Sequence, residues 1–517
     1  MTMRAQTLAA LAARPALDLV VVGGGATGLG VALDAAARGL KVALLEAEDF
    51  AKGTSSRATK LVHGGVRYMA QGHLGLVREA LRERAHLLRN APHLSRPLPF
   101  VMPSYAWWQT PFYGLGLKLY DLLAGSAGLG PTRWLGPART LALLPGVNPQ
   151  GLRGGVQYWD AQFDDARLAL ALARSAVRAG ALVLNHCAVE GLHFEGGRLA
   201  GVIAIDAETQ TRLSLHARCV VNATGVWVDD LRARDSQGLP PEPMVTASQG
   251  VHLVVDRDFL PAEQALLVPK TADGRVLFAV PWLGKVILGT TDTPRQDKPL
   301  EPQAFAEETE FILREAGRYL ARAPQRADVR SVWVGLRPLA RARHAAGGGT
   351  GSISREHSIE CRASGLVSVT GGKWTTYRAI AEEVLAVCMK AKLVPPRPAG
   401  VTRDLPLVGA ADGGPALHQA QGLARYGSEA AAVQSLPGSE RLLGADLSEA
   451  MVRYAARHEF ARTVEDVLAR RSRLLFLDAR EAIRLAEPVA DILQQETGVD
   501  PQLGAFRTLA AGYLLSP

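Results

Sequence analysis

The sequence is poor in cysteine and in long apolar runs. Its four cysteines lie far apart in 517 residues and form no Cys-x-x-Cys pair, so they indicate neither a disulfide framework nor a metal site. No 18 consecutive residues are apolar, and we therefore expect no transmembrane helix. The apolar run 8–13 is short for the core of a signal peptide and predicts a short N-terminal helix instead. These absences favour a cytoplasmic protein.

Lysine is scarce as well, and the charges are dispersed. The chain has 10 lysines against 48 arginines, a formal net charge of +8 and no block of five like charges. A nucleic-acid partner is therefore not favoured. An anionic substrate or an anionic membrane surface would account equally well for the positive sign.

A strong motif stands at the start of the chain. The apolar run 19–22 leads into a Gly-x-Gly-x-x-Gly turn and a helical Ala/Leu stretch. A second apolar run, 42–45, ends in a carboxylate eighteen residues after the last glycine of that turn. This order predicts a dinucleotide-binding βαβ unit. The glycines permit the tight turn, the close approach of a pyrophosphate and the close packing of the helix. The N-terminus of the helix favours phosphate, and the carboxylate can bind a ribose. The candidate cofactor residues are Gly23, Gly25, Thr27, Gly28 and Glu46.

Further segments suit backbone that lies close to a cofactor. Hydroxyls and glycines are dense in residues 54–68, a predicted buried strand ends in a turn at 222–225, and a glycine pair opens a helix at 371–372. The positive end of that last helix would stabilise the negative charge of a reduced flavin. The additional cofactor candidates are Thr54, Ser55, Ser56, Ala223, Gly225, Gly371 and Gly372.

Several cationic residues in or near these segments predict an anion site. Arg67 and Tyr68 follow a glycine pair and can reach out as hydrogen-bond donors. Arg337 stands between residues that restrict the backbone, and a rigidly held guanidinium favours bidentate recognition of an anion. Lys373 offers a compact ammonium group suited to a phosphate or carboxylate oxygen.

The order of the motifs indicates the fold. A chain of 517 residues is expected to form two or three domains. Strands that alternate in polarity at 245–295 separate the first nucleotide motif from the strand–turn–helix near 366–374. The nucleotide domain is therefore discontinuous. This layout favours a flavin cofactor over a nicotinamide cofactor. We predict an α/β fold: a discontinuous Rossmann-like FAD-binding domain with an inserted antiparallel-sheet substrate domain and a C-terminal helical domain. The expected bounds are 15–90, 156–240 and 330–394 for FAD binding, 91–155 and 241–329 for the substrate (cap) domain, and 400–517 for the helical domain, with residues 95–155 rich in loops.

The motifs taken together resemble those of the FAD-dependent glycerol-3-phosphate dehydrogenase family, the membrane-associated respiratory type. The resemblance covers residues 17–480 and is carried by VVVGGGATGLGVALDAAARGLKVALLEAEDF, TSSRATKLVHGGVRY, QFDDARLALALARSAVRAGA, VNATGVWVDD, GTTDT, VGLRPL and TGGKWTTYR. It implies noncovalent FAD, oxidation of sn-glycerol 3-phosphate to dihydroxyacetone phosphate, electron transfer to quinone, and peripheral attachment to the inner face of the cell membrane. The family's substrate contacts fall on Arg67, Tyr68, Arg337, Lys373 and Thr375 or Thr376.

Two positions depart from the family pattern, and neither changes the assignment. Residues 340–344 carry arginines where family members often have acidic residues, and Trp374 stands where an aliphatic residue is usual. We expect Trp374 only to pack.

The predicted reaction needs a phosphate clamp and a base. Arg67, Arg337 and Lys373 would hold the charged groups of the substrate so that the C2 hydrogen faces the flavin. His63 is the nearest motif residue of suitable pKa to take the hydroxyl proton, although it could equally orient the cofactor. The expected catalytic residues are thus Arg337, His63 and Lys373.

Residues 105–120 carry six aromatic side chains in sixteen positions. This density suits either a segment that dips into lipid headgroups or an aromatic loop in the core. A homodimer is a further expectation that the sequence leaves open. Alternatives to the proposed enzyme are a glycerol-3-phosphate oxidase that uses oxygen, an amine or amino-acid oxidase, a flavin-dependent RNA-binding protein and a non-catalytic flavin-binding module.

Overall fold

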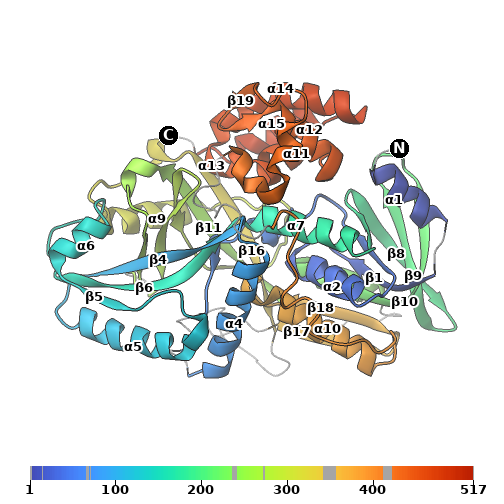
Figure 1. Cartoon of the computed structure of the whole chain (residues 1–517), viewed down its shortest axis with the longest axis horizontal. Helices are drawn as coiled ribbons and strands as arrows, with labels where there is room; N and C mark the ends of the chain where they lie inside the picture. Colours follow the sequence, from blue (N-terminus) through green and yellow to red (C-terminus); the bar gives the residue numbers. More distant parts are fainter. Residues whose placement is uncertain are drawn as a thin grey trace.

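The computed structural model describes residues 3–13, 16–65, 69, 72–235, 242–271, 274–341, 357–410 and 422–515. These residues form two large sheets, side by side, with a helical C-terminal region above both (Figure 1). The predicted fold class is confirmed. No described helix is long and apolar enough to cross a membrane.

The first sheet is a parallel sheet with β1 at its centre. Its strand order is β17-β18-β10-β1-β2-β7, with only β17 antiparallel to its neighbour. The apolar run of β1 is buried on both faces, as a central parallel strand requires. The strands are β1 (Leu17–Val22), β2 (Val42–Leu45), β7 (Leu182–Leu184), β10 (Arg212–Asn222), β17 (His357–Cys361) and β18 (Leu366–Gly371).

Helices cover one face of this sheet, and a smaller antiparallel sheet covers the other. The helices α2 (Ala26–Ala37), α7 (Asp165–Arg178) and α10 (Tyr377–Lys390) lie side by side on the first face. On the second face, β8 (Cys187–Glu195) and β9 (Arg198–Asp206) join the long strand β10, and the short helix α1 (Met3–Ala12) packs nearby. The predicted N-terminal helix is therefore present, and the predicted buried strand that ends in a turn at 222–225 is the last part of β10.

The second sheet has ten strands and is largely antiparallel. Its main path is β15-β11-β14-β13-β12-β4-β6-β3, with β16 paired to β11 and β5 to β6. The strands are β3 (Leu61–Val62), β4 (Ser95–Ser104), β5 (Arg133–Leu135), β6 (Gly154–Phe163), β11 (Val245–Asp256), β12 (Ala265–Val268), β13 (Leu277–Trp282), β14 (Lys285–Gly289), β15 (Thr293–Arg295) and β16 (Ser331–Ala340). The helices around it are α4 (Leu74–Asn90), α5 (Gln109–Ala124), α6 (Pro137–Leu143) and α9 (Ala306–Tyr319). The domain bounds stay a prediction, but β3, β6 and β16 pair in this sheet although their residues fall mainly in ranges expected for FAD binding.

The expectation that residues 95–155 are loop-rich is wrong. β4 pairs with β6 along ten residues although it contains three prolines. Pro97, Pro99 and Pro103 all occupy odd positions, so their missing N–H groups fall on one edge of the strand and leave the ladder with β6 intact. Prolines at this density are typical of a loop, and this explains why the sequence predicts one here.

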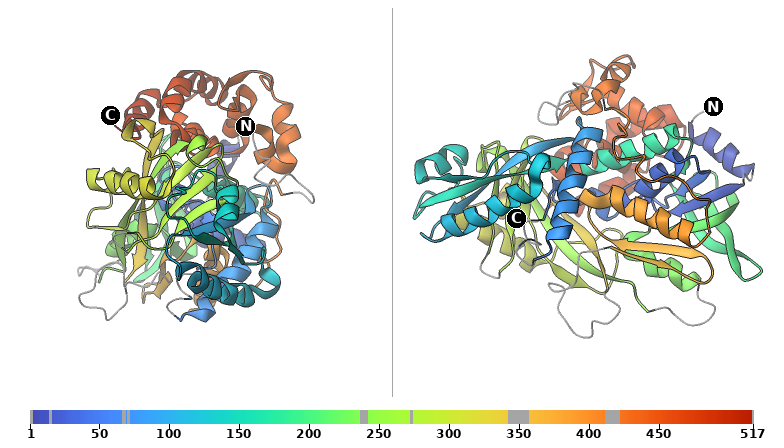
Figure 2. Two further views of the ribbon diagram at one scale, coloured as in Figure 1. Left: turned by 90° about the vertical axis from the view of Figure 1, so that its left-hand side faces the viewer. Right: turned by 60° about the horizontal axis from the view of Figure 1, so that its bottom comes forward.

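The C-terminal region is helical, as expected, and packs onto the second sheet (Figure 2). It contains α11 (Ala430–Gln434), α12 (Glu449–His458), α13 (Leu474–Leu477), α14 (Ala479–Thr497) and α15 (Leu503–Ala511), with a small hairpin of β19 (Leu442–Gly444) and β20 (Leu447–Ser448). The longest helix of this region, α14, is capped at its start by Asp478, whose side chain accepts a hydrogen bond from the N–H of Glu481, and at its end by Gly498 in the left-handed conformation.

Candidate active site

One large cavity lies where the two sheets meet, at the carboxyl ends of β1 and β10. Val22 and Asn222, the last residues of these strands, are register partners, so the turns that follow them are neighbours. The cavity has a volume of about 630 Å³, within the usual range for small-molecule sites. Its position is the crevice at which parallel α/β sheets bind ligands.

The glycine turn is built for close approach, and this provides a test of whether a dinucleotide fits. A Cβ on Gly23 would stand 2.6 Å from the carbonyl oxygen of Ala223, and one on Gly28 would stand 1.9 Å from the carbonyl oxygen of Gly23. Gly23 also has a φ of +108°, which side chains rarely allow. Gly25 precedes α2, and Gly25, Ala26 and Thr27 line the cavity, so the N-terminus of that helix, which favours phosphate, faces it. The residues present fit the pyrophosphate of a dinucleotide.

Glu46 is held at the cavity wall by backbone groups. Its carboxylate accepts hydrogen bonds from the N–H groups of Gly24, at 2.6 Å, and Glu48, at 2.9 Å. Burial raises the pKa of Glu46, although these two hydrogen bonds oppose the rise. The side chain still lines the cavity, where the second acceptor site of each oxygen suits a ribose hydroxyl.

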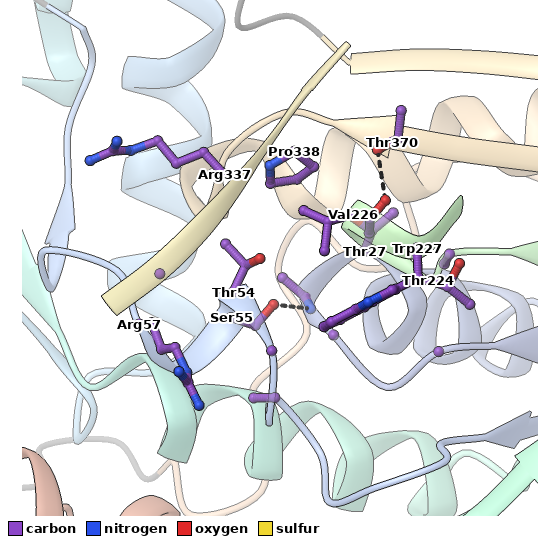
Figure 3. A pocket seen from close by; sticks show the side chains of 18 of the residues that line it. Thr27, Thr54, Ser55, Arg57, Thr224, Val226, Trp227, Arg337, Pro338 and Thr370 are labelled. Carbon is purple, nitrogen blue, oxygen red and sulfur yellow. Dashed lines mark hydrogen bonds between the residues drawn. The ribbon is translucent and has the colours of Figure 1, made fainter. Parts of the chain in front are cut away.

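The segment after β2 connects the two sheets across the cavity. Ser55 Oγ accepts a hydrogen bond from the N–H of Ala26 at 2.9 Å, and Thr54 Oγ1 donates to the carbonyl oxygen of Leu336 at 2.5 Å. Figure 3 shows this segment between Arg337 on one side and Thr224 with Trp227 on the other. Trp374 donates its indole N–H to the carbonyl oxygen of Ser55 at 2.8 Å, so it does more than pack.

The glycine pair at the end of β18 also borders the cavity. Gly371 and Gly372 have φ values of +82° and +80°, and these let the chain turn sharply into the following helix. Thr375 is buried and donates a hydrogen bond to the carbonyl oxygen of His63 at 3.4 Å. Lys373 lines the cavity beside them.

Arg337 is held by four oxygen atoms. Nη1 donates to the carbonyl oxygens of Thr291, at 2.9 Å, and Gln249, at 3.5 Å, and Nη2 donates to Thr290 Oγ1 at 3.0 Å. Asp292 Oδ1 lies 3.3 Å from Nη1 and balances part of the charge. The side chain is 24% exposed, which leaves the guanidinium accessible from the cavity while its orientation is fixed.

Sequence reasoning missed His252, which borders the cavity from β11. Its Nε2 lies 2.9 Å from Thr59 Oγ1, and its ring stacks on Trp333 with centroids 4.0 Å apart. Burial and the neighbouring cations Arg337 and Lys60 hold the pKa of His252 well below its usual range. The one available signal was a histidine within the otherwise apolar run 251–255.

A buried charge network stands behind the Thr54–Ser55 segment. Lys60 Nζ donates to the carbonyl oxygen of Ser56, at 2.8 Å, and to Asp165 Oδ2, at 2.7 Å. Arg473, from the C-terminal region, donates to the same carbonyl oxygen at 2.8 Å and to Asp165 Oδ1 at 3.0 Å. Burial lowers the pKa of Lys60 to about 7 despite the carboxylate beside it. The C-terminal region thus helps to fix the cavity wall.

The structure brings most of the predicted residues together. Those that line the cavity are Gly23, Gly25, Thr27, Glu46, Thr54, Ser55, His63, Ala223, Gly225, Arg337, Gly371, Gly372, Lys373 and Thr375. Gly28 lies behind the turn, where it packs against Gly23, and Ser56 is buried outside the cavity. Arg67 and Tyr68 lie outside the described residues.

A two-sheet fold with a dinucleotide turn at the strand ends defines the class of an FAD-dependent oxidoreductase. Residues 18–384 match the family described as FAD dependent oxidoreductase, and residues 400–503 match the C-terminal domain of alpha-glycerophosphate oxidase. The chain is 40% identical to a mitochondrial glycerol-3-phosphate dehydrogenase of Arabidopsis thaliana, over 95% of this chain and 84% of that protein. It is also 40% identical to that of Homo sapiens, over 93% and 71% respectively.

A solved structure agrees with these matches. The glycerol-3-phosphate dehydrogenase of Bacillus halodurans, complexed with FAD, superposes with a TM-score of 0.80 at 30% identity and covers 99% of this chain and 98% of its own. The chain belongs to the FAD-dependent glycerol-3-phosphate dehydrogenase family, as the sequence motifs predicted.

Proposed function

We propose that this protein oxidises sn-glycerol 3-phosphate to dihydroxyacetone phosphate with FAD as the immediate acceptor and a membrane quinone as the next. The observation that carries the substrate assignment is the rigidly held Arg337, which borders the same cavity as Lys373 and the dinucleotide turn. A guanidinium and an ammonium from residues that line one cavity match the phosphate dianion of the substrate.

The substrate must lose a hydride from C2 and a proton from the C2 hydroxyl. When bound, the flavin supplies two-electron acceptor chemistry. Arg337 and Lys373 would bind the phosphate and orient C2, and we assign His63 the hydroxyl proton. Thr375 supports this role because it bonds the backbone carbonyl of His63 and so fixes that segment.

The reaction can be tested by anaerobic mixing of the FAD-loaded protein with glycerol 3-phosphate. We expect the flavin absorbance to bleach and to return on addition of a quinone analogue. A protein that stays yellow would contradict the proposal and favour a flavin-binding module. Because the C-terminal match carries an oxidase's name, the acceptor needs its own test: faster reoxidation by oxygen than by quinone would favour a glycerol-3-phosphate oxidase.

We further propose that α5 is the membrane contact. Phe112, Leu115 and Leu122 on this helix are 66%, 73% and 77% exposed. With Trp108 and Leu119 they follow a spacing of four and three residues, which places them on one face, while Leu117 and Tyr120 face the core. The helix lies at the periphery of the molecule (Figures 1 and 2). Such an unpartnered apolar stripe suits insertion into the headgroup region of a bilayer.

Flotation with anionic liposomes tests this contact. We expect the wild-type chain to float and a Phe112→Ser/Leu115→Ser variant to remain at the bottom, with unchanged flavin bleaching by glycerol 3-phosphate. Unchanged flotation of the variant would remove α5 from the membrane contact. Loss of a dimer in the same variant, measured by size-exclusion chromatography without lipid, would instead assign the stripe to a second copy of the chain.

A further inference from the structure

Three potential metal ligands gather on the exposed face of the β8–β9–β10 sheet, apart from the active site. His193 and Glu195 belong to β8 and His216 to β10, and both histidines are register partners of Gly201 on the central strand β9. Because Gly201 has no side chain, the two imidazole rings meet above it with centroids 5.0 Å apart. A Cβ on Gly201 would stand 1.9 Å from the carbonyl oxygen of Leu215, so this position requires glycine.

The ligand atoms have the separations that a tetrahedral ion needs. Glu195 Oε1 lies 3.1 Å from His193 Nε2 and 3.5 Å from His216 Nδ1, and all three atoms lie within 4.8 Å of one another. Bonds of about 2.0–2.1 Å from Zn²⁺ to nitrogen or oxygen place neighbouring ligands of a tetrahedron roughly 3.3 Å apart. The distances of 3.1 Å and 3.5 Å lie on either side of this value.

The backbone that carries these ligands is fixed from below. The alternate residues of β10, Leu213, Leu215 and Ala217, are buried in the core on the opposite face of the sheet. The side chains of His193, His216 and Glu195 are 33%, 47% and 62% exposed, which leaves solvent access for a water molecule as the fourth ligand.

A second group of close ligand atoms shows why composition alone does not make a metal site. Asp49, His186 and Asp466 also lie within 4.8 Å of one another. However, Arg470 and Arg471 both donate to Asp49, and Arg470 also donates to Asp466 at 2.8 Å. Guanidinium groups already neutralise these carboxylates, whereas among the described residues the ion-pair partners of Glu195 are the two histidines.

We propose that His193, Glu195 and His216 bind a divalent transition-metal ion of the Zn²⁺ class. Two imidazoles and one carboxylate are a donor set that Zn²⁺ uses in proteins. The ion would join β8 to β10 across the glycine of β9 and so stabilise the edge of this small sheet. This proposal does not depend on the substrate or on the electron acceptor.

The test is a titration of the FAD-loaded, full-length protein, free of any histidine tag, with Zn²⁺ in a calorimeter. We expect one equivalent of Zn²⁺ to bind at this site. The affinity for Zn²⁺ should fall at least about tenfold in His193→Ala and in His216→Ala, because substitution of residues that only hydrogen-bond to metal ligands commonly has an effect of that size. Glu195→Gln should weaken binding as well. His73→Ala, at an exposed histidine before α4, serves as the matched control and should bind as the wild type does.

A second readout uses Co²⁺, whose visible absorbance reports tetrahedral coordination. We expect that absorbance in the wild type and its loss in a His193→Ala/His216→Ala variant. Unchanged flavin absorbance would show that the double variant is folded. If the double variant does not fold, the single variant His216→Gln is used in its place. The proposal is overturned if the wild type binds no Zn²⁺, or if the double variant binds Zn²⁺ with the same stoichiometry and affinity.

Discussion

Arg337 lies against the backbone of Gly250, since a Cβ on Gly250 would stand only 2.3 Å from Nη2 of the guanidinium. The two residues are brought together by the antiparallel pairing of β16 with β11, in which Gly250 is the register partner of Gly335. The absence of a side chain at one position thus determines the orientation of the proposed phosphate ligand at another.

We therefore predict that Gly250→Ala will displace the guanidinium rather than unfold the protein, because the clashing atoms are the end of a flexible side chain. A shift of about 1 Å in a positioning group can lower a rate by about 10²-fold. Stopped-flow flavin reduction should show a loss of this order, with an unchanged melting temperature. Gly504→Ala is the control, because a Cβ there meets nothing within 4 Å. Equal reduction rates in Gly250→Ala and wild type would contradict the positioning role.

Substitution of Arg337 itself separates substrate binding from cofactor binding. Removal of one partner from a desolvated charge pair commonly costs about 2–5 kcal/mol, so Arg337→Ala should lower kcat/KM by at least about 30-fold while the spectrum of bound flavin stays intact. Arg337→Lys should recover part of the loss, because it keeps the charge without the bidentate geometry. Loss of flavin from Arg337→Ala would assign this residue to the scaffold instead.

The parts of the site that sequence could predict are those formed by neighbouring residues. The glycine turn, Glu46 and the Gly371–Gly372 pair were identifiable because a strand, a turn and a helix follow one another directly in the chain. Arg337 was identifiable because a glycine and a proline flank it closely.

The parts that sequence could not predict depend on pairing between distant strands. Gly250 and His252 come to the cavity only because β11 pairs with β16, which begins 75 residues after β11 ends. Nothing in the local pattern distinguishes Gly250 from a glycine that fills no role. The strand β4 was missed for a different reason: its prolines are compatible with a strand only because of the edge on which they fall, and that is a property of the sheet.

The C-terminal region is expected to support cofactor binding through Arg473. This side chain is fully buried and donates to Ser56 and Asp165, so Arg473→Ala leaves Asp165 with Lys60 as its cationic partner. Breaking a buried pair costs roughly 3–5 kcal/mol where the remaining charge has no partner, and Lys60 keeps the loss at or below this range. Urea unfolding should show this loss, and the dissociation constant for FAD should rise.

The matched control for Arg473 is Arg507→Ala. Arg507 is half exposed and pairs with Glu487 on the surface, where ion pairs contribute little. If Arg473→Ala binds FAD as tightly as Arg507→Ala does, the network has no bearing on the cofactor.

A pH effect on stability should arise at His93, which lies near the α7 residues Arg167 and Arg174 and against Gly409 and Gly427 of the C-terminal part of the chain. A Cβ on Gly409 would stand 2.6 Å from its Nε2, so the ring is closely enclosed. Burial and the cations Arg167 and Arg174 lower the pKa of His93 to about 4. Below about pH 6.5 the unfolded chain therefore takes up a proton that the folded chain refuses, and the free energy of unfolding falls as the pH drops from 6.5 toward 4.

The pKa difference of about 2.5 units between the two states corresponds to roughly 3 kcal/mol over this range. His93→Gln should remove the contribution of His93 to the pH dependence. The unfolding free energy should therefore decrease less between pH 7.5 and pH 5 in the variant than in the wild type. Urea unfolding at both pH values measures it, with His73→Gln at the surface as control. Because other groups also titrate in this range, the informative quantity is the difference between His93→Gln and the wild type. If both lose the same free energy between the two pH values, the enclosed ring of His93 is protonated in the folded protein, and its burial does not govern the acid sensitivity of this junction.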